Sequence, residues 1–335
     1  MEIKKYSELP EEIKTELKGA NVFFQETFVD YVHKNNEEFY YVYDDERIVP
    51  IRHRKKAIFN LGVFVTEPFL RVEEPKLAEV DFLDEAVVLA SKVLHIQWLN
   101  STAGCFFYET PTKNCKRIPF GSHVIDLSLT EEELFKKVHS KHRNVIRKAE
   151  KESVMIKKGR AELIEDYAAL ERQTQDRTGR KASGLGYYEK QIEALGNNIV
   201  VYVAYKDDVP QAGGVFYFNQ QMCYYMYGAT ARGAFTGSAN LLIWKAILDM
   251  KSDGVKEFSF VGCRINEDEG SKYSGIQMFK SRFGGELRQG YMFRYERSPL
   301  MYKLFCRAMQ WRTHSNKIYQ DPIDEEIHKW KDIQT

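Results

Sequence analysis

Hydrophobic and polar positions follow the same order in two separate stretches of the chain. Each stretch contains segments with the alternation of half-buried strands, divided by polar turns in which aspartate, asparagine or proline favours a tight reversal. The strands predicted in the first stretch span residues 39–43, 48–53 and 57–65. Those predicted in the second stretch span residues 199–205, 211–218 and 222–230.

Each set of strands leads into a helical pattern. Residues 82–93 follow the first set and residues 238–251 the second, and the second helix leads into a further predicted strand at 257–261. The repeated order predicts two copies of one α+β unit, of which the first is the more diverged.

A basic amphipathic helix is predicted between the two copies, over residues 131–152. Thr130 and Glu133 form a Thr-x-x-Glu capping box at its start. The apolar stripe comprises Leu134, Val138, Val145 and Ala149, and the flanking cations are Lys137, Lys141, Arg143, Arg147, Lys148 and Lys151. A helical tail that carries Met301, Leu304, Phe305 and Met309 is expected to pack against a domain.

Length and composition fit two globular domains, since the chain has 335 residues of which 43% are hydrophobic. We predict an N-terminal domain at 1–125, a C-terminal domain at 126–298 and the tail at 299–335. The formal net charge is +1, so any electrostatic attraction of a partner must be local.

The compartment predicted is the cytoplasm. The five cysteines are scattered without metal-binding or redox spacing, which fits a reducing environment. We expect neither a signal peptide nor a transmembrane segment, because no apolar run has the required length. We also expect no metal, since His-Glu-x-x-His and Cys-x-x-Cys motifs are absent, and no role is assigned to histidines such as His139 and His142.

A lysine between two aromatic residues marks the segment 275–286. Ile276, Phe279 and Phe283 recur at helical spacing, and Gly284 follows as a helix stop. Lys280 therefore lies at the margin of the buried face, where a cation could point along a groove. The alternative is a lysine that snorkels from an ordinary surface helix.

Two further sets of residues could bind a substrate. Arg143 and Arg147, one helical turn apart, could clamp a phosphate together with Lys148, although a solvated linker helix has the same pattern. Tyr225 and Tyr227 are expected to share one face of a strand, which could line a cleft or belong to the core.

The loop before the second helix could receive the pyrophosphate of an acyl-CoA at a helix start. Its candidate residues are Arg232, Gly233, Gly237 and Ser238. The usual spacing of such loops is not cleanly present, and Ser238 could be a simple N-cap.

Taken together, these motifs resemble the FemAB family of peptidoglycan bridge-forming aminoacyltransferases, related to the GNAT acyltransferase fold and to the BioF2-like acyltransferases. The segments that carry the resemblance are 126–128, 141–150, 225–229, 241–247, 258–262, 279–280 and 283–286. The resemblance covers residues 120–295 well and implies an α+β fold of two tandem GNAT-like domains, with mixed sheets flanked by helices and a cleft between the domains.

The resemblance also implies acyl transfer to an amine. The donor would be an aminoacyl-tRNA and the acceptor a UDP- or lipid-linked muropeptide, with no permanently bound cofactor. Lys280 would stabilise the negative charge that develops on the attacked ester, and Phe279 would flank the substrate. Arg143 and Arg147 would hold acceptor phosphates, and Tyr225 and Tyr227 would line the cleft.

Two departures from the family pattern keep other functions open. Ser259 occupies a position where many relatives have aspartate, and the long helical hairpin that some Fem enzymes use as a tRNA arm has no counterpart. An acyl-CoA-dependent polysaccharide or lipid N-acyltransferase is therefore an alternative. So is a degenerate GNAT pair that binds a phosphorylated ligand or RNA without turnover.

Overall fold

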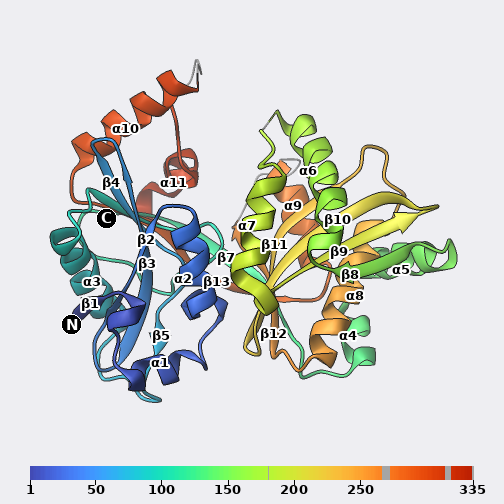
Figure 1. Cartoon of the computed structure of the whole chain (residues 1–335), viewed down its shortest axis with the longest axis horizontal. Helices are drawn as coiled ribbons and strands as arrows, with labels where there is room; N and C mark the ends of the chain where they lie inside the picture. The colour runs from blue at the N-terminus through green and yellow to red at the C-terminus, as the bar shows by residue number, and fades with distance from the viewer. Residues whose placement is uncertain (180, 266–271, 314–317, 334–335) are drawn as a thin grey trace. The chain divides into compact units, whose positions relative to one another are not determined.

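The structure is a computed structural model that describes residues 1–179, 181–265, 272–313 and 318–333. The chain divides into two compact units (Figure 1). Unit 1 comprises the described residues of Met1–Ser122, Gly262–Asn266 and Arg288–Thr335, and unit 2 those of His123–Val261 and Glu267–Leu287. The predicted tail at 299–335 includes residues 314–317 and 334–335, which lie outside the described residues.

Unit 1 contains a mixed sheet with helices on both faces. Its strands follow the order β1-β2-β3-β4-β6-β13, with β5 paired to β3, and the β4–β6 pair is parallel. The strands are β1 (Glu2–Lys4), β2 (Glu38–Tyr43), β3 (Arg47–Lys56), β4 (Phe59–Phe64), β5 (Phe69–Leu70), β6 (Trp98–Ser101) and β13 (Glu286–Glu296). The helices are α1 (Glu11–Leu17), α2 (Glu26–Lys34), α3 (Glu79–Val93), α10 (Pro299–Arg312) and α11 (Pro322–Glu326), with 3₁₀ turns at Tyr6–Glu8, Val22–Phe24 and Ile327–Ile333.

Unit 2 repeats this plan with the strand order β7-β12-β11-β10-β9-β8. Its strands are β7 (Cys115–Asp126), β8 (Met155–Gly159), β9 (Ile199–Lys206), β10 (Val209–Phe218), β11 (Met222–Thr230) and β12 (Glu257–Arg264). Its helices are α4 (Glu131–Lys137), α5 (Ser140–Lys151), α6 (Ile164–Thr178), α7 (Leu185–Leu195), α8 (Ser238–Ser252) and α9 (Lys272–Ser281), with 3₁₀ turns at Ala161–Leu163 and Gly196–Asn198.

The internal repeat predicted from the sequence is confirmed. In unit 1 the three antiparallel strands β2, β3 and β4 lead through α3 to β6, which pairs in parallel with β4. In unit 2 the strands β9, β10 and β11 lead through α8 to β12, which pairs in parallel with β11. The α+β class is therefore confirmed, with the same connection in both copies.

The contact division differs from the contiguous boundaries 1–125 and 126–298. Strands β7, β12 and β13 each contribute residues to both units, so the chain passes between the units several times. The tail helices α10 and α11 belong to unit 1, where Tyr302 and Cys306 of α10 pack against Leu61 and Trp98. The order of the elements along the sequence did not indicate that the chain passes between the units in this way.

The predicted helix 131–152 is wrong in one respect, because it is two helices. The Thr130–Glu133 capping box is present, but Val138 is extended and His139 caps a new helix. This break shifts the helical phase, so α5 buries His142, Ile146 and Ala149, while Val145 is only partly buried.

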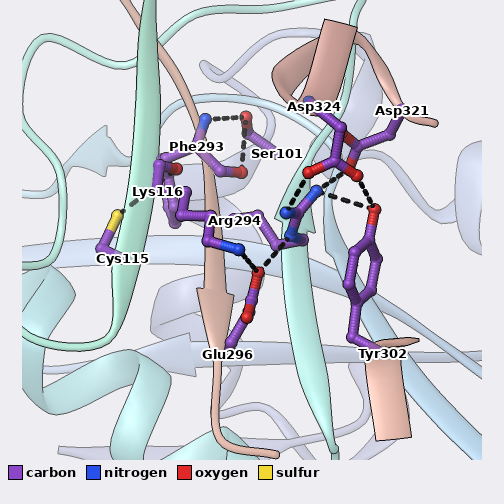
Figure 2. Close-up of polar contacts among 9 residues, drawn as sticks. All are labelled: Ser101, Cys115, Lys116, Phe293, Arg294, Glu296, Tyr302, Asp321 and Asp324. Carbon is purple, nitrogen blue, oxygen red and sulfur yellow. Dashed lines mark hydrogen bonds and ion pairs between the residues drawn. The ribbon is translucent and has the colours of Figure 1, made fainter. Parts of the chain in front are cut away.

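A buried arginine holds the end of the chain on unit 1 (Figure 2). The Arg294 side chain on β13 is fully buried and forms ion pairs with Glu296, Asp321 and Asp324. The Tyr302 hydroxyl of α10 accepts a hydrogen bond from Arg294 at 2.8 Å and donates one to Asp324 at 2.6 Å. Burial opposes ionisation of Arg294 and Asp324, but their mutual attraction prevails, so the pKa of Asp324 is lowered.

We expect Arg294→Met to destabilise unit 1 by about 3–5 kcal/mol, because it leaves buried carboxylates without their cation. Urea unfolding measures this change. Lys245→Met, which removes an exposed pair with Glu150 at 3.5 Å, is the control and should cost less than about 1 kcal/mol. Equal losses in the two variants would contradict a structural role for the buried network.

Candidate functional site

Strands β11 and β12 of unit 2 are paired over three positions, from Met222 opposite Glu257 to Tyr224 opposite Ser259. Beyond this point β11 continues to Thr230 and β12 to Arg264, and no further pairing joins them among the described residues. Two parallel strands that separate in this way expose backbone donors and acceptors between them.

A β-bulge in β11 lies where this separation begins. Tyr225 is opposite Phe216 and Tyr227 is opposite Val215, so Met226 is the extra residue. The extra residue places the two tyrosines on opposite faces. The prediction that Tyr225 and Tyr227 share one face is therefore wrong, because strict alternation fails at a bulge.

Tyr225 belongs to a run of aromatic contacts on the face covered by α5, α8 and α9. Its ring stacks on Phe216 at 5.0 Å and meets the edge of Phe260 at 6.2 Å. Phe260 stacks on Phe283 at 5.3 Å, which contacts Phe279 at 5.4 Å. Burial raises the pKa of Tyr225, so its hydroxyl stays protonated. Tyr225 and the helix of Lys280 thus share one cluster.

Tyr227 belongs to a second cluster, beneath α7. Its hydroxyl lies 3.0 Å from that of Tyr187, and its ring contacts Tyr188 and Tyr217. Tyr227 and Tyr187 are both partly exposed, so this cluster contributes to the surface of unit 2.

Strained backbone occurs in β12, on the other side of the gap that opens between β11 and β12. Val261 in β12 has a φ of 49°, a conformation that β-branched residues avoid. The Ser259 hydroxyl accepts a hydrogen bond from the Val261 N–H at 3.1 Å, which helps to hold this conformation. Ser259 is thus part of the local geometry of β12. Such strain is concentrated at functional sites.

Lys280 lies in the last turn of α9 and is partly buried. The preceding Phe279 packs against the buried ring of His142 at 5.2 Å. Burial lowers the pKa of His123 on β7, and the positive charge of Lys280 adds to this shift. Lys280 is therefore close enough to His123 for its charge to disfavour protonation of that imidazole. Ile276, however, is exposed, so the predicted apolar stripe of this helix is only partly buried.

The glycine that follows α9 fixes the helix to the α4–α5 junction. Gly284 has a φ of +85°, and a Cβ there would lie 2.7–2.8 Å from Lys137, including its backbone. In the same contact the His139 N–H donates to the carbonyl of Arg282 at 2.8 Å. Gly284 therefore allows a close backbone approach in addition to following the end of the helix.

The basic residues of α5 point in two directions. Arg143 donates to the carbonyls of Lys136 and Val138 at the end of α4, and the Arg147 guanidinium lies 5.2 Å from the Phe135 ring. Lys148 instead lies over the ring of Phe235, at 5.6 Å, in the loop before α8. Arg147 and Lys148 are exposed, whereas Arg143 is partly buried and links two helices.

The loop that contains Arg232 and Gly233 uses many of its own donors. The N–H groups of Arg232 and Phe235 donate to the side chains of Gln173 and Gln211, each at 2.9 Å. Ser238 is not the N-cap, because Gly237 holds that position with a φ of 94°, and Ser238 is a buried first helical residue. A Cβ on Gly237 would lie 2.2 Å from the carbonyl oxygen of Val145 in α5.

Other features of the structure do not suggest chemistry. Across the described ranges, no group of three or more His, Cys, Asp or Glu residues is arranged to hold a metal ion. A cavity of about 650 Å³ lies beside α3 in unit 1, but the Asp84 carboxylate on its wall already accepts hydrogen bonds from Thr112. None of the helices that the structure describes is long and apolar enough to span a membrane.

Sequence reasoning assigned no role to several residues of this site. His142 was considered and given no role, and His123 was not mentioned, yet His123 is within electrostatic reach of Lys280 and His142 packs on Phe279. The helical spacing of His142, Ile146 and Ala149 could have indicated a buried histidine. Nothing in the sequence signals the strain at Val261.

The repeated α+β units define a protein with two GNAT-like domains. A FemX crystal structure is similar, with a TM-score of 0.67 at 13% identity over 91% of this chain and 99% of that chain. The FemAB family model matches residues 108–208 and 204–309, more than half of the chain, so the chain belongs to the FemAB family. Membership supports aminoacyltransferase activity in broad terms.

The fold also occurs in other proteins of low sequence identity. The C-terminal domain of a putative lysylphosphatidylglycerol synthetase from Agrobacterium fabrum matches with a TM-score of 0.56 at 9% identity, over 90% of this chain and 96% of that chain. L-PGS from Bacillus licheniformis matches with a TM-score of 0.56 at 11% identity, over 93% and 98%. No curated protein sequence matches the chain significantly.

We expect Gly284→Ala to destabilise unit 2 by more than the cost of a left-handed alanine, which is about 1–2 kcal/mol. The added methyl group would also collide with Lys137. Gly179→Ala is a matched control, because Gly179 has a φ of +65° and a methyl group added there would meet nothing within 4 Å. Thermal unfolding of both variants measures the difference, and equal losses would refute the close-approach argument.

Protonation of His142 should destabilise unit 2 in acid. Burial lowers its pKa to about 4 from 6.5, and the charges of Arg282 and His139 add to the shift. Between these two values the unfolded chain binds a proton that the folded chain does not. The free energy of unfolding therefore falls as the pH falls through this window, by at most about 3 kcal/mol.

The His142→Phe variant isolates this effect, since phenylalanine fits the aromatic surroundings and does not titrate. We expect the stability of the wild type to decline relative to the variant when urea unfolding is repeated from about pH 7 down to about pH 4. Parallel pH profiles of the two proteins would show that His142 contributes no such linkage.

Proposed function

We propose that unit 2 transfers an aminoacyl group from an activated ester to an amine on a phosphorylated acceptor, such as a UDP- or lipid-linked muropeptide. The observation that carries this proposal is the position of Lys280. Lys280 directly follows Phe279, whose ring belongs to the aromatic cluster that includes Tyr225, and its charge contributes to the lowered pKa of the buried His123. A fixed cation at a site of low polarity is suited to stabilise a developing oxyanion.

In the proposed reaction, the neutral amine of the acceptor attacks the ester carbonyl of the donor. A C–N bond forms, the C–O bond to the leaving hydroxyl breaks, and the proton lost by the amine is returned to the leaving oxygen. Lys280 stabilises the negative charge on the carbonyl oxygen between these events. Tyr225, held protonated by burial, and Phe279 shape the apolar side of the site.

We further propose that Arg147 and Lys148, which are exposed on α5, bind the phosphates of the acceptor. Arg143 is the third candidate, but its guanidinium also binds the end of α4, so its main contribution is to orient α5. Tyr227 faces the second aromatic cluster and would contact a different part of the substrate from Tyr225.

We propose an aminoacyl-tRNA as the donor, because the loop geometry disfavours an acyl-CoA. An acyl-CoA pyrophosphate would need free N–H groups in the loop of Arg232, Gly233, Gly237 and Ser238. The N–H groups of Arg232, Phe235 and Ser238 donate to acceptors within the protein. Family membership supports the same choice.

Lys280→Met tests the proposal, because it retains most of the stem and removes the charge. We expect kcat for amino-acid transfer from labelled aminoacyl-tRNA to a UDP-muropeptide to fall on the order of a hundredfold or more, with little change in acceptor binding. Lys245→Met on α8 is the control and should retain activity.

Three outcomes would contradict the proposal. Unchanged turnover in a folded Lys280→Met protein would remove Lys280 from the mechanism. Transfer from acyl-CoA alone would overturn the proposed donor. Tight binding of the phosphorylated acceptor by wild type, without transfer from either donor, would favour a degenerate binding protein.

A further inference from the structure

Helix α10 of unit 1 has a second apolar face that is exposed. Leu300, Leu304 and Trp311 are 68%, 41% and 83% exposed. Their spacing places them on one side of the helix, opposite the face that carries Tyr302 and Phe305. An exposed tryptophan among exposed leucines is costly in water, so a face of this kind usually marks an interaction surface.

The tip of the β3–β4 hairpin lies beside this helix (Figure 1). Phe59 at the start of β4 contacts the ring of Phe305 at 5.4 Å. The tip itself exposes Lys55, Lys56 and Ile58, the last of which is 67% exposed. We call these three residues and the exposed residues Leu300, Lys303, Leu304, Arg307, Trp311 and Arg312 of α10 the α10 surface.

The α10 surface is basic although the whole chain is nearly neutral. Residues 52–66 and 297–320 contain no aspartate or glutamate. Burial lowers the pKa of Lys56, and the neighbouring charges of Arg312 and Arg54 lower it further. Lysines and arginines from two segments far apart in the sequence thus crowd together, which costs free energy unless an anion is nearby.

We propose that the α10 surface binds anionic phospholipid membranes. Leucine, isoleucine and tryptophan side chains would enter the boundary between headgroups and acyl chains, and the surrounding lysines and arginines would contact the lipid phosphates. The 14 residues of α10 are too few to cross a bilayer, so the helix would lie along the membrane surface.

A protein partner fits this surface less well. Lysine is depleted at protein–protein interfaces, whereas Lys55, Lys56 and Lys303 all belong to the α10 surface. Basic residues around exposed tryptophan and leucine are typical of helices that lie in a membrane interface. This inference does not depend on the proposed transfer reaction, because it concerns residues of unit 1 alone.

The test is flotation of the full chain with vesicles of phosphatidylcholine, with or without phosphatidylglycerol. We expect binding to vesicles that contain phosphatidylglycerol, weak binding to phosphatidylcholine alone, and loss of binding at high salt. Trp311→Ser with Leu304→Ser, and separately Lys55→Glu with Lys56→Glu, should each weaken binding by about tenfold or more.

Matched controls separate this surface from general effects. Val88→Ser with Val209→Ser removes two side chains that are each 56% exposed elsewhere in the chain, and should leave vesicle binding unchanged. All of the altered residues are exposed, so thermal unfolding should verify that every variant folds. Equal binding to neutral and anionic vesicles, or full binding by the α10 variants, would overturn the proposal.

Self-association is the remaining outcome. If analytical ultracentrifugation without lipid shows a dimer that Trp311→Ser with Leu304→Ser dissociates, the α10 surface is an interface between copies of the chain. That result would also overturn the membrane proposal.

Discussion

The candidate site depends on one close backbone contact, between the turn after α9 and the junction of α4 and α5. Gly284 lies against the backbone of Lys137, and the His139 N–H donates to Arg282 in the same contact. Because backbone positions are fixed on both sides, α9 has little freedom to slide along α5. The position of Lys280 and the orientation of the basic helix are thus set together.

The second constraint is the bulge in β11. One extra residue, Met226, turns Tyr225 into the aromatic cluster of Phe260 and Phe283, and turns Tyr227 toward Tyr187. It does so where β11 and β12 stop pairing and where Val261 carries strain. The two faces of the sheet therefore differ at this place in unit 2, since one carries the aromatic cluster that includes Phe279, next to Lys280 in the sequence, and the other carries Tyr227 and Tyr187. A transferase must accommodate both a donor and an acceptor.

The sequence predicted the elements well because their signals are local. Aspartate turns and alternating strands located the two meanders, and the Thr130–Glu133 box located the start of α4. The failures arise where a single residue changes the phase of a pattern. The break at Val138 moved the buried stripe to Ile146, and the bulge at Met226 separated the tyrosines. The glycine pair that includes Gly284 is visible in the sequence. Its contact with Lys137, which is 147 positions away in sequence, could be found only from the structure.

The charge of the α10 surface follows from the buried network of the same unit. The acidic residues that come after α10 pair with cations outside that helix. Asp321 and Asp324 are held by Arg294, while Glu325 and Glu326 pair with Arg264. Four carboxylates close in sequence to Lys303, Arg307 and Arg312 are therefore paired with other cations. A nearly neutral chain can in this way carry a basic surface, since the acidic residues close to it in sequence are paired with other cations.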